Sequence, residues 1–217
     1  MDIRRLCALA GVIGPIGFTA GWLIAQAVAG PEYDPSRHAL SELGAVGAPY
    51  AWVMLAGQAI GGVGTIAFAL GALWPSVRPS RTGAVGSWLL ALSGLGLDNV
   101  SDVFFRLDCR TADGCTDAQQ TASWHGTVHG IVAITVLLLP VVPLILAWAF
   151  RRLPDWRPFV WPSVAVGVVQ VALIGAAVSL GSRAGSGYAA RAGALVASAW
   201  VVALAVRTLR GPRRPGP

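Results

Sequence analysis

The chain has 217 residues, of which 55% are hydrophobic and only 12% are charged. Soluble domains carry about 25% charged residues, and a mean hydropathy of +0.64 indicates that lipid is the solvent of this chain. The formal net charge of +6 does not indicate a nucleic-acid partner, because the basic residues form short clusters between long apolar runs. The composition therefore predicts an integral membrane protein with no nucleic-acid partner.

A helix needs about 20 apolar residues to cross the hydrocarbon of a bilayer. Six segments fit this requirement, roughly Leu6–Ala29, Ala51–Trp74, Ala84–Phe105, His125–Phe150, Val160–Leu180 and Ala190–Val206. The breaks between them are rich in proline, glycine and charge, and none is long enough to form a second domain. We therefore expect residues 1–217 to form a single all-α membrane domain, a six-transmembrane-helix bundle, because helices satisfy their own backbone hydrogen bonds in lipid.

The arginines predict the orientation of this bundle, since cytoplasmic loops carry an excess of basic residues. All 16 basic residues are arginine, and eleven of them lie on one side of the predicted helices. These eleven are Arg4, Arg5, Arg78, Arg81, Arg151, Arg152, Arg157, Arg207, Arg210, Arg213 and Arg214. Both termini are therefore expected in the cytoplasm (N-in/C-in), in a multi-pass protein of the cell membrane.

Two cysteines, Cys109 and Cys115, lie six residues apart in a polar loop on the predicted outer side. This spacing favours a small disulfide loop, which persists in an oxidising compartment. A metal-binding pair is the alternative, but no histidine or further cysteine stands beside the two.

Small residues and prolines indicate local features of the bundle. The spacing Gly57-x-x-x-Gly61 predicts a close contact between two helices. Pro140 and Pro143 are expected to kink the fourth helix.

Two carboxylates lie inside the third apolar segment, toward its outer end. Ionisable groups at membrane depth cost at least about 2.5–3.5 kcal/mol each on insertion scales, so they normally face the interior of the bundle and mark function. Asp98, Asp102 and Arg106 are spaced at four residues, close to one face of a helix. Asp102 and Arg106 can form a salt bridge, whereas Asp98 has no evident local partner. The two aspartates are therefore candidate catalytic residues.

Two histidines, His125 and His129, open the fourth segment at a spacing of four residues. Imidazoles at this spacing share a helix face and can bind one metal ion. The alternative is a pair of interfacial histidines hydrogen-bonded to the aspartates of the neighbouring helix. The third histidine, His38, lies in the first outer loop with Ser41 and Glu42, so all these candidates are expected on one side of the membrane. They can meet only if this loop folds down over the helix ends.

Three motifs together resemble a bacterial membrane protein family, the domain of unknown function numbered 998, over nearly the whole chain. The matching residues are His38, Ser41, Leu43 and Gly44 before the second helix, Asp98, Asp102, Arg106, Asp108 and Cys109 at the end of the third, and His125, Gly126, His129 and Gly130 at the start of the fourth. The resemblance implies a bundle of six helices and supplies no activity.

A looser similarity is to the ceramidase-like transmembrane hydrolases, including those of the adiponectin-receptor type. That superfamily has a serine, an aspartate and a late His-x-x-x-His around zinc, and the order Ser41, Asp102, His125 and His129 is similar. Those proteins have seven helices, however, with the histidine pair in the last one. The similarity implies a zinc ion held by His125 and His129, with His38 or an aspartate as a further ligand.

These observations favour a membrane-embedded enzyme acting on an apolar lipid or isoprenoid substrate at the extracytoplasmic half of the bilayer. Two forms are open: a metal-dependent hydrolase, or an acid-initiated terpene cyclase in which a buried carboxyl protonates an alkene or epoxide. The candidate catalytic residues are Asp98, Asp102, Ser41 and Glu42. A proton- or cation-coupled transporter and a non-catalytic membrane subunit are the alternatives. Membrane lipids and an apolar small molecule are the expected partners, and homo-oligomerisation stays open.

Overall fold

The structure is a computed structural model that describes residues 2–211. All regular secondary structure within these residues is helical, which confirms the predicted all-α class. The α-helices are α1 (Ile3–Ala27), α2 (Ala51–Phe68), α3 (Trp74–Val77), α4 (Arg81–Leu92), α5 (Asn99–Phe104), α6 (Asp117–Gln120), α7 (Trp124–Val132), α8 (Leu138–Phe150), α9 (Val160–Leu180) and α10 (Ser186–Leu209). Short 3-10 or π turns are η1 (Leu40–Gly44), η2 (Ala69–Leu73), η3 (Gly94–Asp98), η4 (Thr111–Asp113), η5 (Ala133–Leu137) and η6 (Pro154–Phe159).

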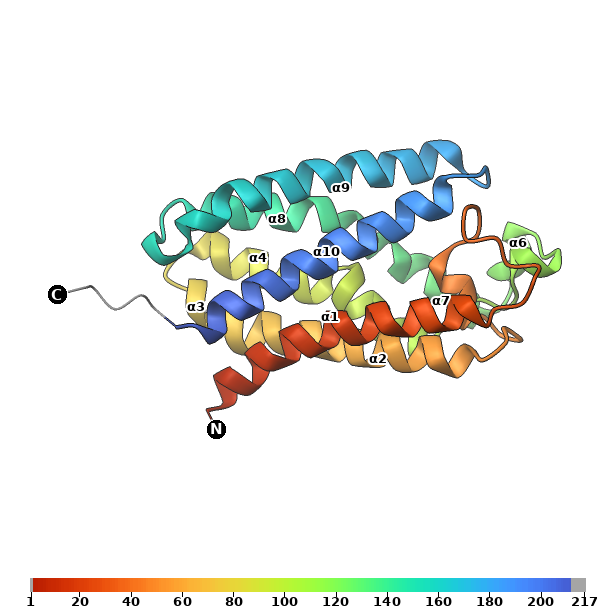
Figure 1. Cartoon of the computed structure of the whole chain (residues 1–217), viewed down its shortest axis with the longest axis horizontal. Coiled ribbons are helices and arrows are strands. Elements are labelled where there is room, and N and C mark those ends of the chain that lie inside the picture. The colour runs from red at the N-terminus through yellow and green to blue at the C-terminus, as the bar shows by residue number, and fades with distance from the viewer. Residues whose placement is uncertain (1, 212–217) are drawn as a thin grey trace.

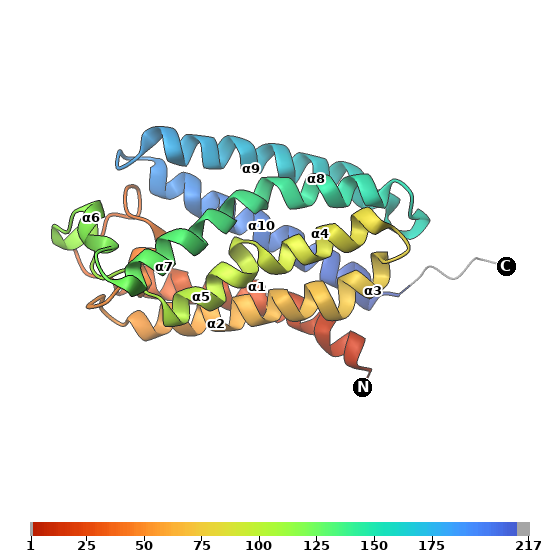
Figure 2. The same cartoon turned by 180° about the vertical axis from the view of Figure 1, so that it is seen from behind.

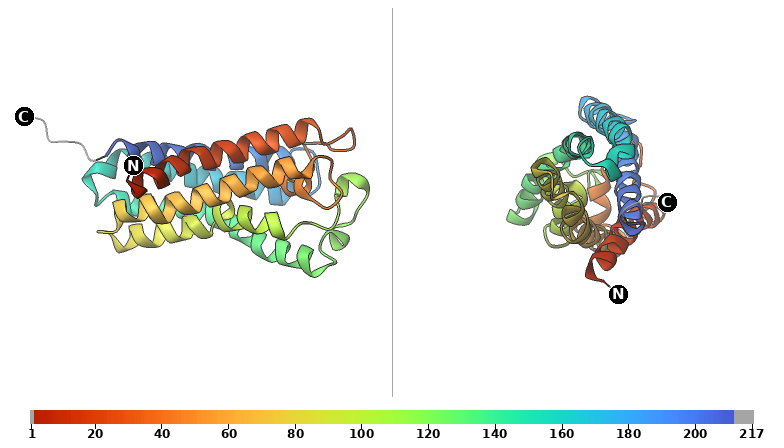
Figure 3. Two further views of the ribbon diagram at one scale, coloured as in Figure 1. Left: turned by 90° about the horizontal axis from the view of Figure 1, so that it is seen from below. Right: turned by 90° about the vertical axis from the view of Figure 1, so that its left-hand side faces the viewer.

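The long helices run side by side in one elongated bundle (Figures 1 and 2). α1 packs against α2 and α10, α10 against α9, α9 against α8, and α8 against α4. α4 contacts η2 and η3, which both contact α2, so these helices form a closed arrangement, here called the ring. The start of α1 and the end of α10 lie at one end, here called the terminal end. The loops that contain η1, η4 and α6 lie at the other end, here called the distal end (Figure 3).

Five helical stretches of the described chain are long and apolar enough to cross a membrane. They are Ile3–Ala27, Ala51–Val77, Trp124–Phe150, Pro154–Leu180 and Ser186–Leu209. Each overlaps one of the six segments expected from the sequence, with ends shifted by a few residues. The chain is therefore a membrane protein by length and composition of its helices.

The remaining predicted segment, Ala84–Phe105, is not one continuous helix. α4 ends at Leu92, Ser93 has an extended backbone (φ −75°, ψ 175°), and the chain resumes as the π turn η3 followed by α5. Ser93 Oγ donates to the Leu90 carbonyl at 2.8 Å, which occupies one of the carbonyls freed at the end of α4. The break and the π turn set the direction of α5, and π turns are frequent at functional sites.

The fourth segment also changes its helical form, as its prolines predict. Pro140 has no N–H to bond the carbonyl of Val136, and its ring crowds that carbonyl. The 3-10 turn η5 occupies Ala133–Leu137, immediately before α8, and separates α7 from α8. The helix therefore changes pitch next to the residue whose hydrogen bond the proline removes.

Glycines bring α1 and α2 into direct backbone contact. A Cβ built on Gly57 would lie 2.9 Å from the Cα of Gly21, and one built on Gly64 would lie 2.7 Å from the Cα of Gly14. Such distances leave no room for even a methyl group. The predicted role of Gly57 in a close helix contact is thus seen between α1 and α2.

Replacing Gly57 by alanine is expected to destabilise the protein by about 1–3 kcal/mol, because the added methyl group forces two backbones apart. Gly175 in α9 is the matched control, since nothing lies within 4 Å of a Cβ built there. Gly175→Ala should be neutral or stabilising, as alanine is the better helix former. Thermal unfolding of both variants in the same detergent measures the difference, and equal melting temperatures would contradict the glycine contact.

Candidate functional site

A cavity of about 520 Å³ lies in the distal half of the bundle, among the helices of the ring. Most of its wall is apolar and comes from α7, η5, α9 and α10. Most of its polar side chains come from α2, η3, α5 and α7. The polar residues that line it are Ser41, Gln58, Asp98, Asn99, Asp102, His129 and Gln170. An apolar pocket with a few convergent polar groups is the usual form of a site for a small molecule.

An aspartate and a histidine form the centre of the polar cluster. Asp102 Oδ1 lies 2.8 Å from His129 Nδ1, and Gln58 Nε2 donates to Asp102 Oδ2 at 2.6 Å. The carbonyl oxygen of Phe105 lies 3.1 Å from the same His129 nitrogen and accepts its N–H. Asp102 Oδ1 makes no directed hydrogen bond with this N–H, so its interaction with the imidazole is electrostatic. Asp102, His129 and Gln58 are all buried.

The contacts of His129 determine its tautomer. Both neighbours of Nδ1, a carboxylate oxygen and a carbonyl oxygen, are acceptors, so this nitrogen carries a proton. Nε2 makes no hydrogen bond within residues 2–211 and belongs to a side chain that lines the cavity. In the neutral ring Nε2 is therefore free to accept a proton from a molecule in the cavity, with Asp102 stabilising the imidazolium that forms.

Asp98 is the polar residue with the fewest protein partners. Its side chain is only 9% exposed, it lines the cavity, and its Oδ1 has no hydrogen-bond partner in the described part of the chain. Gln170 Nε2 donates to the Gly193 carbonyl at 2.8 Å, but Gln170 Oε1, like Gln58 Oε1 and Asp102 Oδ1, is also buried without a hydrogen-bond partner in the described residues. Buried polar atoms of proteins are nearly always paired, so an unpaired carboxylate oxygen facing a cavity marks a place for a ligand.

The structure brings four of the seven candidate residues from the sequence to this cavity: Ser41, Asp98, Asp102 and His129. Ser41 reaches it because the first distal loop folds over the helix ends as η1. Gln58 also lines the cavity, although the sequence analysis gave it no role. The signal that could have identified it is a polar amide within the predicted membrane segment Ala51–Trp74. The expected Asp102–Arg106 salt bridge does not form: Arg106 donates instead to the carbonyls of Gly44 and Ala45, at 2.7 and 2.6 Å.

The other three candidates lie outside the lining of the cavity. The Glu42 carboxylate is buried between loops, where it accepts from Thr111 Oγ1 at 2.8 Å and from the Ala112 N–H at 3.2 Å. His38 Nδ1 accepts from the Asp34 N–H at 2.9 Å. His125 is exposed and packs on Trp124, with 3.7 Å between ring centroids.

The three histidines are therefore not brought together around one point. Within residues 2–211 no group of three or more His, Cys, Asp or Glu side chains is placed to hold a metal ion. His129 also directs Nδ1 to Asp102 and Phe105, and His125 lies one turn nearer the distal end. These residues do not fit the zinc site that the looser resemblance implied.

Arginines hold the distal loops in place over the cavity. The buried Arg191 guanidinium donates to Gln26 Oε1 at 2.6 Å, to the carbonyls of His38 and Gly187 at 3.0 and 2.9 Å, and to the Tyr33 hydroxyl. Burial raises the pKa of Tyr33 to about 12, so its hydroxyl keeps its proton and donates to the Ala39 carbonyl at 2.9 Å. η1, and Ser41 with it, is thus fixed from both sides.

The second distal loop, between α5 and α7, is closed by the disulfide Cys109–Cys115, as predicted. Within it, Arg110 donates to both oxygens of Asp113 at 2.7 and 2.6 Å and to the Ala29 carbonyl at 3.0 Å. The Arg110 hydrogen bonds lower the pKa of Asp113. The loop is therefore tied both to itself and to the end of α1.

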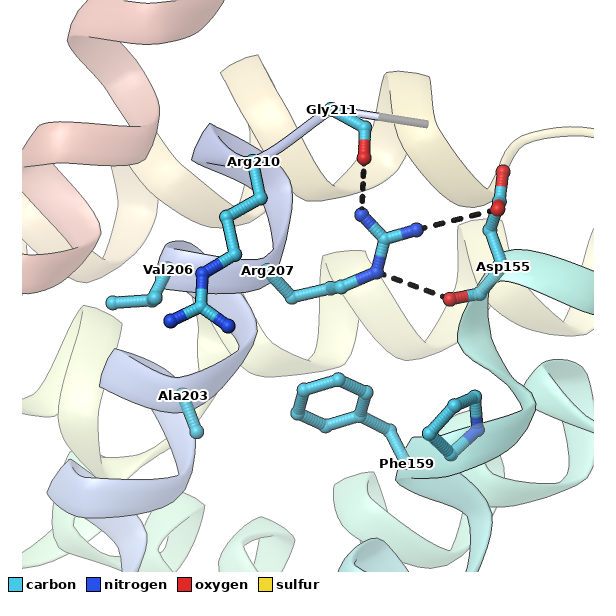
Figure 4. Close-up of a pocket in the computed structure, with 8 residues that line it drawn as sticks. Asp155, Phe159, Ala203, Val206, Arg207, Arg210 and Gly211 are labelled. Atoms are coloured by element: carbon cyan, nitrogen blue, oxygen red, sulfur yellow. Dashed lines mark hydrogen bonds and ion pairs between the residues drawn. The ribbon is translucent and has the colours of Figure 1, made fainter. Parts of the chain in front are cut away.

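A second, smaller cavity of about 240 Å³ lies at the terminal end (Figure 4). Arg207 donates to the backbone carbonyls of Asp155 and Gly211 at 3.1 and 2.5 Å, and it pairs with the Asp155 carboxylate at 3.5 Å. These contacts join the end of α10 to η6. Since the arginine is already satisfied by protein groups, we regard this cavity as structural.

Comparison with known proteins finds one matching family. The family model described as "Protein of unknown function (DUF998)" matches residues 12–207. No curated protein and no solved structure matches the chain. The match includes every residue that lines the distal cavity, from Phe18 to Ala194. The chain belongs to the DUF998 family.

Proposed function

We propose that this protein is a membrane-embedded enzyme that performs acid–base chemistry on an apolar lipid or isoprenoid molecule held in the distal cavity. The observation that carries the proposal is the Asp102–His129 pair, with Asp98 beside it, in a largely apolar cavity at membrane depth. Ionisable groups in such a place are costly, so a structural role alone is a poor explanation for them.

The proposed chemistry uses His129 Nε2 as the group that exchanges a proton with the substrate. Asp102 and the Phe105 carbonyl hold the ring in one tautomer, and Gln58 holds Asp102. A neutral imidazole can take a proton from water or from the Ser41 hydroxyl, which leads to hydrolysis. A protonated one can give a proton to an alkene or an epoxide, which leads to cyclisation. Neither path requires a metal ion.

We further propose that the protein lies in the cell membrane with both termini in the cytoplasm. Nine of the 14 arginines within residues 2–211 lie toward the terminal end, and a disulfide, which needs an oxidising compartment, lies in a distal loop. α4, η3 and α5 follow one another along the bundle over residues 81–104 and would form the sixth crossing. The cavity then lies in the extracytoplasmic half of the bilayer.

The test is a screen for turnover by protein in lipid nanodiscs. Acyclic isoprenoid alcohols and epoxides, lipid esters and lipid amides are offered together, and products are read by mass spectrometry. Hydrolysis yields two smaller molecules, whereas cyclisation yields an isomer of unchanged mass and altered retention. His129→Gln should abolish the product, because glutamine keeps hydrogen bonds but cannot take up a proton.

The matched control is His125→Gln, since His125 is exposed and outside the cavity. This variant should turn over substrate like the parent protein. The proposal fails if the His129 variant forms the same product at the same rate, or if none of these substrate classes is converted by the parent protein.

A further inference from the structure

The distal cavity has an opening to one side of the bundle. Three of its lining residues are strongly exposed: Ile134 (63%), Leu137 (54%) and Val178 (74%). Residues that both line a cavity and reach the surface mark its mouth. Two come from η5 and one from the distal part of α9, so the mouth lies between these two elements.

The position of this mouth along the helices indicates that it faces lipid. Leu137 is 13 residues from Trp124, the distal end of a 27-residue span, which corresponds to a depth of about 20 Å at 1.5 Å per residue. Val178 is two residues from Leu180, the distal end of the next span, so the mouth extends from the distal edge of the spans to about this depth. The spans Trp124–Phe150 and Pro154–Leu180 are the two least buried of the five. All three mouth residues are apolar. A molecule that enters here therefore comes from the bilayer.

The cavity also has a chemical requirement at its polar wall. Asp98 Oδ1 is buried without a hydrogen-bond partner among residues 2–211, and so are three other acceptor oxygens of the wall, Gln58 Oε1, Asp102 Oδ1 and Gln170 Oε1. Asp102 differs from Asp98 in that Gln58 Nε2 donates to its second oxygen and His129 lies beside it. A carboxylate oxygen accepts hydrogen bonds and gives none when ionised. The complementary ligand group is thus a donor, such as a hydroxyl or an amide N–H.

We infer that the ligand is a lipid with one long apolar chain and a hydrogen-bond-donating head, which enters from the bilayer between η5 and α9 and places its head at Asp98. The cavity volume of about 520 Å³ lies in the range of sites for drug-sized molecules, which suits one chain and a small head. The inference rests on the proposed function and deepens it, since it names the substrate class and its route.

The test uses photolabelling in nanodiscs. The probe is a saturated long-chain alcohol with a diazirine on the chain close to the hydroxyl, and its comparison is the methyl ether of the same alcohol. After irradiation and digestion, mass spectrometry reports which residues carry the label. We expect the alcohol to label the interior of the cavity, at residues such as Leu95 and Leu173, at least about tenfold more than the ether, because the ether cannot donate to Asp98.

Two substitutions separate the route from the head group. Ala177→Trp places a large ring in the cavity wall of α9 and should remove interior labelling, whereas Ala172→Trp, exposed on the same helix and outside the cavity, should leave it unchanged. Asp98→Leu should make the alcohol and the ether label equally. Thermal unfolding of each variant verifies that it is folded.

Equal interior labelling by alcohol and ether in the parent protein would overturn the donor requirement. Parent-level labelling in the Ala177→Trp protein would overturn the route. His125→Gln should be labelled like the parent, since His125 is exposed and lies outside the cavity. If labelling behaves as expected but no substrate class is turned over, the enzymatic proposal fails and the lipid site stands.

Discussion

Replacing Asp102 by asparagine is expected to lower turnover about 10²–10⁴-fold, the usual contribution of an acid–base group, while the bundle stays folded. The reason is the proton on His129. Asparagine can accept from Gln58 as Asp102 does, and it then presents an amide N–H to His129 Nδ1. The Phe105 carbonyl still accepts from Nδ1, but the neutral amide no longer stabilises the imidazolium that forms when Nε2 takes up a proton.

The same change removes a buried charge from the bundle, so stability should be unchanged or slightly raised. Initial rates and melting temperatures of one preparation therefore separate lost chemistry from lost structure. Asp117→Asn is the control, because Asp117 is exposed in a distal loop and should affect neither quantity. A fully active Asp102→Asn protein would eliminate the aspartate–histidine pair as the reacting unit.

Replacing Arg191 by alanine is expected to cause the largest loss of stability, about 3–5 kcal/mol. The substitution removes four protein partners of a buried guanidinium and leaves Gln26 Oε1 and the His38 carbonyl without donors. For a domain of this size we expect a drop in melting temperature of about 6–20 °C, at about 2–4 °C per kcal/mol.

Arg183→Ala provides the comparison for Arg191, since Arg183 is exposed in the loop before α10. It should change the melting temperature by less than about 2 °C, in line with surface substitutions of about 0.5 kcal/mol. Thermal scans of purified protein in one detergent are sufficient. Similar melting temperatures for the two variants would show that Arg191 does not hold the distal loops.

The sequence predicted the helical class and five of the spans because apolar length is a strong signal in lipid. It did not predict the division of Ala84–Phe105 into α4, η3 and α5. The run Ser93-Gly94-Leu95-Gly96 contains no proline, and glycines in membrane helices more often indicate close packing than a break. The break depends on tertiary contacts that periodicity does not report, such as the approach of Gly94 to Val136 of η5.

The candidate site was predictable in part. Asp98 and Asp102 were identifiable because carboxylates are rare at membrane depth. Ser41 and His129 were associated with them because all four residues are expected on the same side of the membrane. Helical spacing could not separate His129 from His125, because residues four apart lie near one face. The two histidines differ in their position along the helix axis. Trp124 starts α7, so His125 lies in the first turn and is exposed, whereas His129 lies one turn further into the bundle and is buried. Glu42 looked catalytic, but its buried carboxylate binds the loop backbone.

The contact between α1 and α2 has a consequence for which molecules the cavity can admit. These helices meet backbone to backbone at Gly14–Gly64 and Gly21–Gly57, so at these two points no side chain can yield by changing rotamer, and α5 packs on α2. The carboxylates of Asp98 and Asp102 are thereby attached to the stiff side of the ring. α9 and η5, which form the apolar mouth, are the least enclosed part. Selectivity should accordingly be strict for the polar head of a ligand and tolerant of the length of its chain.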